Sequence, residues 1–204
     1  MLLDPRNLLS KAFFYRWFQG LIGREEPWKR FVEGLDILPG QRVLDIGCGP
    51  ASILAQLPND IEYFGLDHNP NYIEEAQAKY GSRGTFIVRS ISAELAKEFG
   101  QFDTILAIGV LHHLDDAGAE ALLAAASKVL KPDGKLVSFD GVFFDGQNPI
   151  AKFLLYLDRG RFVRTSDAYE NLAKRNFPKV KSRFIHDLLA VPYSHFVMEC
   201  KLRE

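Results

Sequence analysis

The stretch VLDIGCGPA, residues 43–51, decides how this 204-residue chain folds. It begins as a short apolar run typical of a buried strand and ends in a turn that contains Gly47 and Gly49. Glycines directly after a buried strand let the backbone approach a ligand where any Cβ atom would collide. Asp67 lies twenty residues after Gly47 and directly follows the next apolar run, 61–66. An acidic side chain at this spacing accepts hydrogen bonds from ribose hydroxyls, so the pattern indicates a nucleoside-binding site.

The turn departs from the form that binds dinucleotides. The GxGxxG pattern requires a third glycine where this chain has Ser52. Pro50 also lacks the backbone N–H group that would help to hold a pyrophosphate. We therefore expect a nucleoside-like ligand without a pyrophosphate.

Apolar runs of strand length alternate with helical stretches through the middle of the chain. The expected strands are 42–46, 61–66, 85–88, 102–108 and 135–139, and the expected helices are 51–57, 71–80, 92–98 and 117–130. This alternation predicts a parallel sheet with helices on both faces, which is an α/β fold. Two further runs, 180–185 and 195–200, predict a terminal antiparallel hairpin.

We expect a single domain with additions around its core. The expected parts of residues 1–204 are an N-terminal helical cover (1–41), a cofactor-binding core (42–140), an insertion or lid (141–178) and a terminal β-hairpin (179–204).

Four segments of the core resemble the motifs of the class I S-adenosylmethionine-dependent methyltransferases. They are VLDIGCGP (43–50), FGLDHNPNYI (64–73), FDTILAIGVLHHLDD (102–116) and LKPDGKLV (130–137). The resemblance implies a Rossmann-like three-layer sandwich. Its mostly parallel, seven-stranded sheet would have the order 3-2-1-4-5-7-6, with strand seven antiparallel. The resemblance also implies a methyltransferase that uses S-adenosyl-L-methionine as cofactor and releases S-adenosyl-L-homocysteine.

The resemblance further implies a set of cofactor-binding residues. Asp67 stands for the acid that binds the ribose, and Ser90 stands where the family often has an acid near the adenine. His68 replaces a commonly aliphatic residue, and its imidazole can lie against the adenine face. The whole set is Asp45, Gly47, Cys48, Gly49, Asp67, His68, Ser90, Ile91, Ala107, Ile108 and His112.

Three residues are candidates for a catalytic role. His112 and His113 follow the expected fourth strand, where a histidine can act as a base near neutral pH. In the structural alternative, one of them orients the cofactor and the other packs under the following helix. Asp140 ends the expected fifth strand and could hold a substrate hydroxyl, or it could serve only as the first residue of an Asp-Gly turn.

The candidate substrate contacts lie in the last third of the chain. Arg159, Arg161 and Arg164 fall within six residues, and arginine matches carboxylate or phosphate groups, so we expect that at least one binds an anionic acceptor. The alternative is that they pair with acidic side chains and fasten the insertion. The loop that joins the two last strands offers further contacts, His186, Tyr193 and His195, or is simply a folded loop.

The composition excludes several classes of protein. Lys and Arg number 25 against 26 Asp and Glu, so no global basicity indicates nucleic acid. The five His and two Cys show neither a disulfide framework nor a metal-ligand spacing, and we expect no metal. No apolar run reaches the ~20 residues of a membrane-spanning helix, and no signal-peptide pattern opens the chain. A cytoplasmic protein without a membrane span is the expectation, and its oligomeric state stays open.

Three functions fit these features. The first is methyl transfer to a small-molecule acceptor at oxygen, nitrogen or carbon, with 1–41 and 141–178 enclosing the acceptor. The second is a methyltransferase that docks RNA or protein on a basic face at 161–183. No DNA substrate is expected, because the (N/D)PP(Y/F) motif of adenine methylation does not follow the expected fourth strand. The third is a protein that binds the cofactor without catalysis.

Overall fold

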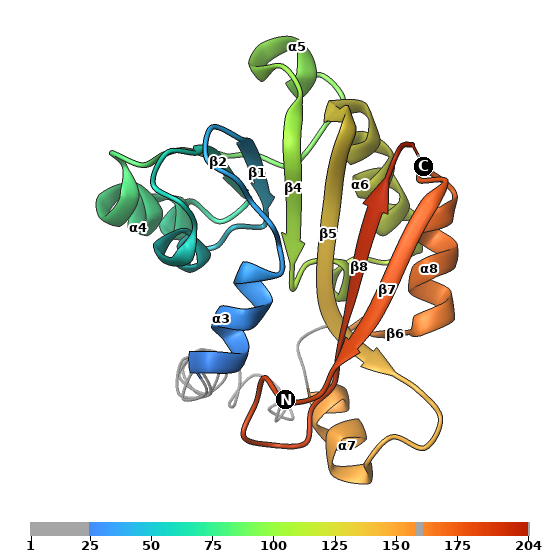
Figure 1. The fold of residues 1–204 in the computed structure, drawn as a ribbon. Helices are drawn as coiled ribbons and strands as arrows, with labels where there is room; N and C mark the ends of the chain where they lie inside the picture. The colour runs from blue at the N-terminus through green and yellow to red at the C-terminus, as the bar shows by residue number, and fades with distance from the viewer. Residues whose placement is uncertain (1–24, 158–160, 204) are drawn as a thin grey trace, which may run out of the picture.

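An eight-stranded sheet forms the centre of the computed structural model, which describes residues 25–157 and 161–203 (Figure 1). Its strands are β1 (Arg42–Ile46), β2 (Glu62–Asp67), β3 (Gly84–Val88), β4 (Phe102–Ile108), β5 (Leu130–Phe143), β6 (Arg164–Thr165), β7 (Lys179–Ile185) and β8 (His195–Lys201). Its helices are α3 (Glu25–Glu33), α4 (Pro70–Tyr80), α5 (Leu95–Phe99), α6 (Asp116–Val129), α7 (Pro149–Leu157) and α8 (Ser166–Lys174), with short 3₁₀ helices η1 (Ser52–Gln56) and η2 (Leu111–His113).

The strand order confirms the prediction. The main path runs β3-β2-β1-β4-β5-β8-β7, in which β7 and β8 are the two strands expected to close the chain. The pairs β1–β2, β2–β3, β1–β4 and β4–β5 are parallel. Strand β8 is antiparallel to both β5 and β7. All the parallel strands therefore end at one edge of the sheet, which we call the carboxyl edge.

Two details of the sheet differ from the prediction. An eighth strand, β6, pairs with β5 through only two residues, too few to produce an apolar pattern in the sequence. Strand β5 also continues to Phe143 instead of ending at Asp140, because Val142 and Phe143 pair with β6 and Gly141 pairs with His195 of β8. Asp140 is therefore a buried strand residue and not the start of an Asp-Gly turn.

Helices cover both faces of the sheet and give the predicted three layers. One face packs against α3, η1 and α4, and the other packs against α5, α6 and α8. Helices α6 and α8 lie behind β5, β8 and β7 in Figure 1. The two longest helices of the described residues, α6 and α4, each begin at a side-chain cap. The side chain of Asn69 accepts from the N–H of Asn71, and that of Asp115 accepts from the N–H of Gly118.

The region expected to be an insertion contributes in part to the core. Residues 141–143 belong to β5, and α8 buries Tyr169, Leu172 and Ala173 against the sheet. Between these parts, α7 lies at the carboxyl edge (Figure 1). The N-terminal part of the expected cover, residues 1–24, lies outside the described residues.

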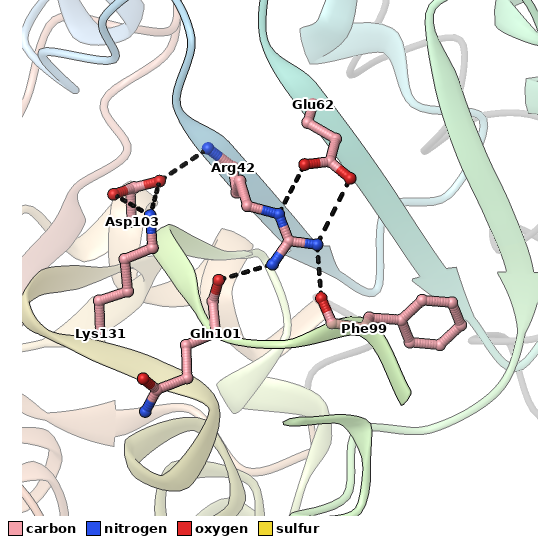
Figure 2. Close-up of polar contacts among 6 residues, drawn as sticks. All are labelled: Arg42, Glu62, Phe99, Gln101, Asp103 and Lys131. Atoms are coloured by element: carbon pink, nitrogen blue, oxygen red, sulfur yellow. Dashed lines mark hydrogen bonds and ion pairs between the residues drawn. The ribbon is translucent and has the colours of Figure 1, made fainter. Parts of the chain in front are cut away.

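The opposite, amino edge of the sheet is held by a group that we call the Arg42 cluster (Figure 2). The Arg42 guanidinium donates to both carboxylate oxygens of Glu62 and to the carbonyl oxygens of Phe99 and Gln101. The Arg42 backbone N–H donates to Asp103, whose carboxylate also accepts from Lys131 at 2.8 Å. Partial burial raises the pKa of Asp103, but the donors from Lys131 and Arg42 outweigh it and leave that pKa below its ordinary value. The cluster thus ties β1, β2 and β4 together.

Candidate functional site

The turn between β1 and η1 is the centre of the candidate site. Gly47, Gly49 and Ala51 all have left-handed backbone angles, with φ values of 68°, 53° and 54°. The N–H groups of Gly47 and Cys48 both donate to the carbonyl oxygen of Leu66, at 2.7 and 3.0 Å. These bonds fold the turn over the end of β2, so the carboxyl ends of β1 and β2 form one surface.

The two glycines of the turn have different roles. A Cβ atom on Gly47 would lie 2.8 Å from a methyl carbon of Val110, so Gly47 faces neighbouring protein. This corrects the expectation that a side chain there would enter the ligand space. A Cβ atom on Gly49 would meet no atom of residues 25–157 and 161–203 within 4 Å, so Gly49 borders the open side of the turn. Gly49 is therefore the position where a bound molecule can come closest to the backbone.

Asp67 ends β2 directly beside this open side. Its carboxylate accepts from the N–H of Gly49 at 3.0 Å and from the N–H of Asn69 at 2.8 Å. Each carboxylate oxygen can accept further hydrogen bonds, so both oxygens can still bind hydroxyl groups. The side chain is 7% exposed and held rigidly, as a group that recognises a ribose requires.

Asp45 is the second acid at this edge and has an unexpected partner. Its carboxylate accepts a 2.6 Å hydrogen bond from the hydroxyl of Tyr63, and both side chains are buried. Burial raises the pKa of Asp45 to about 7, although the Tyr63 hydrogen bond lowers it, and the nearby Asp67 raises it further. A tyrosine in an otherwise apolar strand needs a hydrogen-bond partner, and that requirement is the sequence signal that could have identified Tyr63.

The other predicted cofactor residues surround the turn at different depths. His68 is 90% exposed and free of packing that would hold its ring away from a ligand. Ser90 is exposed just beyond β3, whereas Ile91 packs on the core that α5, α6 and α8 cover. Ala107 is buried at the end of β4, and Ile108 is half-buried beside it. Cys48 turns its sulfur toward Gly65, and burial raises its pKa, so its thiol is inert.

His112 and Asp140 form a buried pair between η2 and β5. One Asp140 oxygen, Oδ1, lies 2.8 Å from Nδ1 of His112 and also accepts from the His112 backbone N–H at 3.1 Å. Among the described residues the other oxygen, Oδ2, is buried without a hydrogen-bond partner. His113 is exposed, and its ring lies 4.1 Å from that of His112. Of the three catalytic candidates, the structure thus brings His112 and Asp140 together.

Arg164 does not have the geometry expected of a substrate clamp. Its guanidinium donates to Asp116 and to the carbonyl oxygens of Leu111, Leu114 and Phe162. With Nη2 also 2.8 Å from Asp116, all its N–H groups have partners inside the protein. We therefore correct the expectation: Arg164 fastens β6 to the segment that carries His112.

Two further residues that we expected to contact the substrate, Arg161 and His186, lie at the surface of the protein. Arg161 is exposed next to β6, and Arg159 lies outside the described residues. His186 is exposed, with Nδ1 2.9 Å from the hydroxyl oxygen of Ser194 and its ring stacked on Phe184. These contacts fit a folded loop and neither support nor oppose a substrate role.

Helix α3 and the loop between β7 and β8 lie together at the carboxyl edge (Figure 1). Arg30 of α3 pairs with Asp187 of this loop at 2.9 Å. Tyr193 is buried, and its hydroxyl would lie 2.7 Å from a Cβ atom on Gly141. With Phe139 of β5 and His195 of β8, Tyr193 forms an aromatic wall beside α3, whose Phe31 packs on Phe139.

His195 belongs to this wall and is an uncharged residue. Its ring stacks on Phe139 with 4.4 Å between the ring centres, and it lies 4.8 Å from the ring of Tyr193. Burial lowers the pKa of His195 to about 3, with smaller contributions from His112 and His186. Its Nδ1 atom is buried and has no hydrogen-bond partner in the described part of the chain. His195 therefore adds no positive charge to the site at neutral pH.

The acids of the carboxyl edge share one property. We call Asp45, Asp67 and Asp140 the site aspartates: all three are buried, and no Lys or Arg of the described residues forms an ion pair with them. Within residues 25–157 and 161–203, no three His, Cys, Asp or Glu side chains gather in a way that could hold a metal ion. No helix in those ranges has the length and apolar character needed to cross a membrane.

Known proteins share this sequence pattern and fold. A methyltransferase-domain family matches residues 43–134. An uncharacterized methyltransferase of Synechocystis sp. is 28% identical over 133 residues, which cover 60% of this chain and 62% of that protein. Phosphoethanolamine N-methyltransferase 1 of Arabidopsis thaliana is 29% identical over 163 residues, which cover 76% of this chain and 33% of that protein. This chain thus spans less than two thirds of the length of either relative.

A solved structure shows the same fold over nearly the whole described chain. The YcgJ protein from Bacillus subtilis superposes with a TM-score of 0.63 at 17% identity, covering 88% of this chain and 99% of that one. The glycine turn, the acid that ends β2 and the order of the sheet agree with the family match. The family match over residues 43–134, the methyltransferase relatives and the order of the sheet together support a class I S-adenosylmethionine-dependent methyltransferase.

Proposed function

We propose that this protein transfers the methyl group of S-adenosyl-L-methionine to a small-molecule acceptor. The observation that carries the proposal is the open side of the turn at Gly49 beside the rigidly held carboxylate of Asp67. A nucleoside fits this arrangement, because the backbone leaves room for it and the acid can bind its two ribose hydroxyls. The exposed ring of His68 lies close by, where it can stack on an adenine.

Asp45 suits the charged end of the cofactor. S-adenosylmethionine has a positively charged sulfur and an ammonium group, and the sulfur carries the methyl group that is transferred. Asp45 is buried without a cationic partner among the described residues, so a cationic ligand end lowers the cost of its charge. S-adenosylhomocysteine keeps the ammonium group and fits the same contacts.

The His112–Asp140 pair is proposed to handle the acceptor. A carboxylate that binds Nδ1 of a histidine holds the proton on that nitrogen and orients the ring. In that tautomer Nε2 is the basic ring atom, which can take the proton of a hydroxyl or amine acceptor. The aromatic wall of Phe139, Tyr193 and His195 is proposed to line the acceptor side and exclude water.

The hypothesis that the acceptor is anionic loses much of its support. Arg164 is committed to protein contacts, which leaves the exposed Arg161 and the undescribed Arg159. His195 is neutral at physiological pH, and the nearby Asp140 repels an anion. We therefore propose an acceptor whose reacting end is uncharged or cationic.

The two alternative functions have weaker support. The basic face expected at 161–183 is reduced in the structure, because Arg164 is buried, Lys174 pairs with Glu170 and Arg175 pairs with Glu120. Arg161, Lys181 and Arg183 remain exposed on separate elements, before β6 and along β7. This dispersal favours a small molecule over RNA or protein. A protein that only binds the cofactor would not require the buried His112–Asp140 pair.

The test is a transfer reaction with S-adenosylmethionine that carries a deuterated methyl group. The wild-type protein is incubated separately with the low-molecular-mass fraction, the RNA and the protein of a cell extract, and labelled products are found by mass spectrometry. Label in a low-molecular-mass product, lost in the His112→Asn variant, is the expected result. Label confined to RNA or protein, or cofactor binding without any labelled product, would contradict the proposal.

A further inference from the structure

Tyr63 is the partner of a carboxyl group that forms no ion pair with a Lys or Arg of residues 25–157 and 161–203. The Tyr63 hydroxyl donates to Asp45 Oδ2 at 2.6 Å, and the two residues are 1% and 3% exposed. They lie on adjacent strands, where Val43 is opposite Tyr63 and Asp45 is opposite Gly65. A buried carboxylate with one neutral donor is costly unless a positive charge approaches it.

The groups that surround Asp45 do little to stabilise its ionised form, so the hydrogen bond from Tyr63 matters for its charge. A Cβ atom on Gly65 would lie 2.8 Å from the sulfur of Cys48 and 2.9 Å from the ring of Phe86, so the space beside Asp45 is filled with weakly polar groups. The titratable groups that act on Asp45 are Tyr63 and Asp67. Tyr63 favours the ionised form of Asp45, whereas the charge of Asp67 opposes it, and the nearby Cys48 is a neutral thiol because burial raises its pKa.

We propose that Tyr63 is a positioning residue of the cofactor site, whose hydroxyl holds the Asp45 carboxylate ionised and oriented for the ammonium group of the bound cofactor. The inference rests on the proposed function, since it takes S-adenosylmethionine as the ligand. It assigns a role to a side chain on β2 that faces the core and does not itself reach the open side of the turn.

If Tyr63 has this role, its removal changes how the affinity for the cofactor depends on pH. With a pKa of about 7, Asp45 is partly protonated near neutral pH and binds an ammonium group less well as the pH falls. Removal of the Tyr63 hydroxyl takes away the interaction that lowers this pKa, so the pKa rises and the loss of affinity begins at a higher pH. A purely structural role would weaken binding equally at every pH.

The experiment measures the Kd of S-adenosylhomocysteine by calorimetry from pH 6 to pH 9 for the wild type and for Tyr63→Phe. The ratio of the two Kd values is the readout, because titration of the ligand cancels in it. We expect the variant to bind about threefold more weakly near pH 7.5 and to match the wild type at pH 9. The matched control is Tyr80→Phe, another buried tyrosine of the same core, for which the ratio stays at one.

A second variant keeps the proposal falsifiable if Tyr63→Phe does not fold. Asp45→Asn should bind weakly, with a Kd whose dependence on pH between 6 and 8 is reduced. Two results would overturn the role of Tyr63 and leave the proposed function intact. One is a Kd ratio for Tyr63→Phe that is constant over pH, and the other is an Asp45→Asn variant whose Kd has the pH dependence of the wild type. Absence of binding to the wild type at every pH would overturn the proposed function as well.

Discussion

The two edges of the central sheet hold their acidic side chains in opposite ways. In the Arg42 cluster at the amino edge, each carboxylate is paired with an arginine or lysine and remains partly exposed (Figure 2). At the carboxyl edge the site aspartates are buried, and their partners are N–H groups, a tyrosine hydroxyl and a histidine ring.

We propose that this difference separates acids that stabilise the fold from acids that bind a ligand. Partly exposed ion pairs stabilise the fold modestly and need nothing more from a ligand. Buried acids without cations, in contrast, cost stability and persist where a ligand uses them. Loss of an ion pair at the amino edge should therefore change stability but not cofactor affinity, and loss of an acid at the carboxyl edge should weaken cofactor binding.

The largest expected effect compares the two glycines of the turn. Gly47→Ala places a Cβ atom against Val110 at a left-handed backbone angle and should lower the free energy of unfolding by about 2–4 kcal/mol. Gly49→Ala meets no neighbour and should cost only about 1 kcal/mol, but it should weaken S-adenosylhomocysteine binding at least tenfold. Chemical denaturation and calorimetry measure the two quantities.

A control separates steric conflict from backbone strain at Gly47. The double variant Gly47→Ala/Val110→Ala removes the methyl group that the new Cβ atom would meet, so it should be more stable than the sum of the two single changes predicts. Strict additivity would show that the Val110 contact does not constrain the turn.

The next effect belongs to the amino edge. Arg42→Met keeps an apolar stem on Phe64 and Phe102 but leaves Glu62 and two carbonyl oxygens without their donor. We expect a loss of about 1–2 kcal/mol in the free energy of unfolding, since the pair is partly exposed. The Kd of S-adenosylhomocysteine should not change, and a weakened affinity would remove the distinction between the two edges.

The smallest effect is a dependence of stability on pH from His195. Its pKa in the folded protein, about 3, lies below its ordinary value, so the unfolded chain binds more protons and stability is lost as the pH falls from about 6.5 toward 3. Between pH 6.5 and 5.5 this contribution amounts to about 1 kcal/mol. His195→Phe should remove it, so the wild type should lose about 1 kcal/mol relative to the variant over that interval in denaturant titrations. Parallel pH profiles would show that the ring is not held neutral.

The features that were predictable from the sequence are those with a local pattern. The turn at Gly47 and Gly49 and the acid at Asp67 are visible because each follows an apolar strand at a set spacing. The strand order followed from the family resemblance, and the structure confirms it. The caps at Asn69 and Asp115 were likewise predictable, since they depend only on the next few residues.

The features that escaped prediction depend on contacts between distant segments. The hydrogen bond from Tyr63 to Asp45 arises from the register of two strands, which no linear pattern encodes. The commitment of Arg164 depends on carbonyl groups about 50 residues away, so its cluster with Arg159 and Arg161 resembled an anion site. The role of Gly47 was misjudged for the same reason, because Val110 comes next to it only in the folded chain.

The most direct test of the account compares one acid from each edge in a single calorimetric experiment. S-adenosylhomocysteine is titrated at constant pH into the wild type, into Asp67→Ala and into Asp103→Ala, and the melting temperature of each protein is recorded. A charge-assisted hydrogen bond contributes about 1.5–3 kcal/mol, so Asp67→Ala should raise the Kd roughly 10–150-fold. Asp103→Ala should lower the melting temperature and leave the Kd unchanged. Equal Kd values for Asp67→Ala and the wild type would contradict the assignment of the carboxyl edge as the cofactor site.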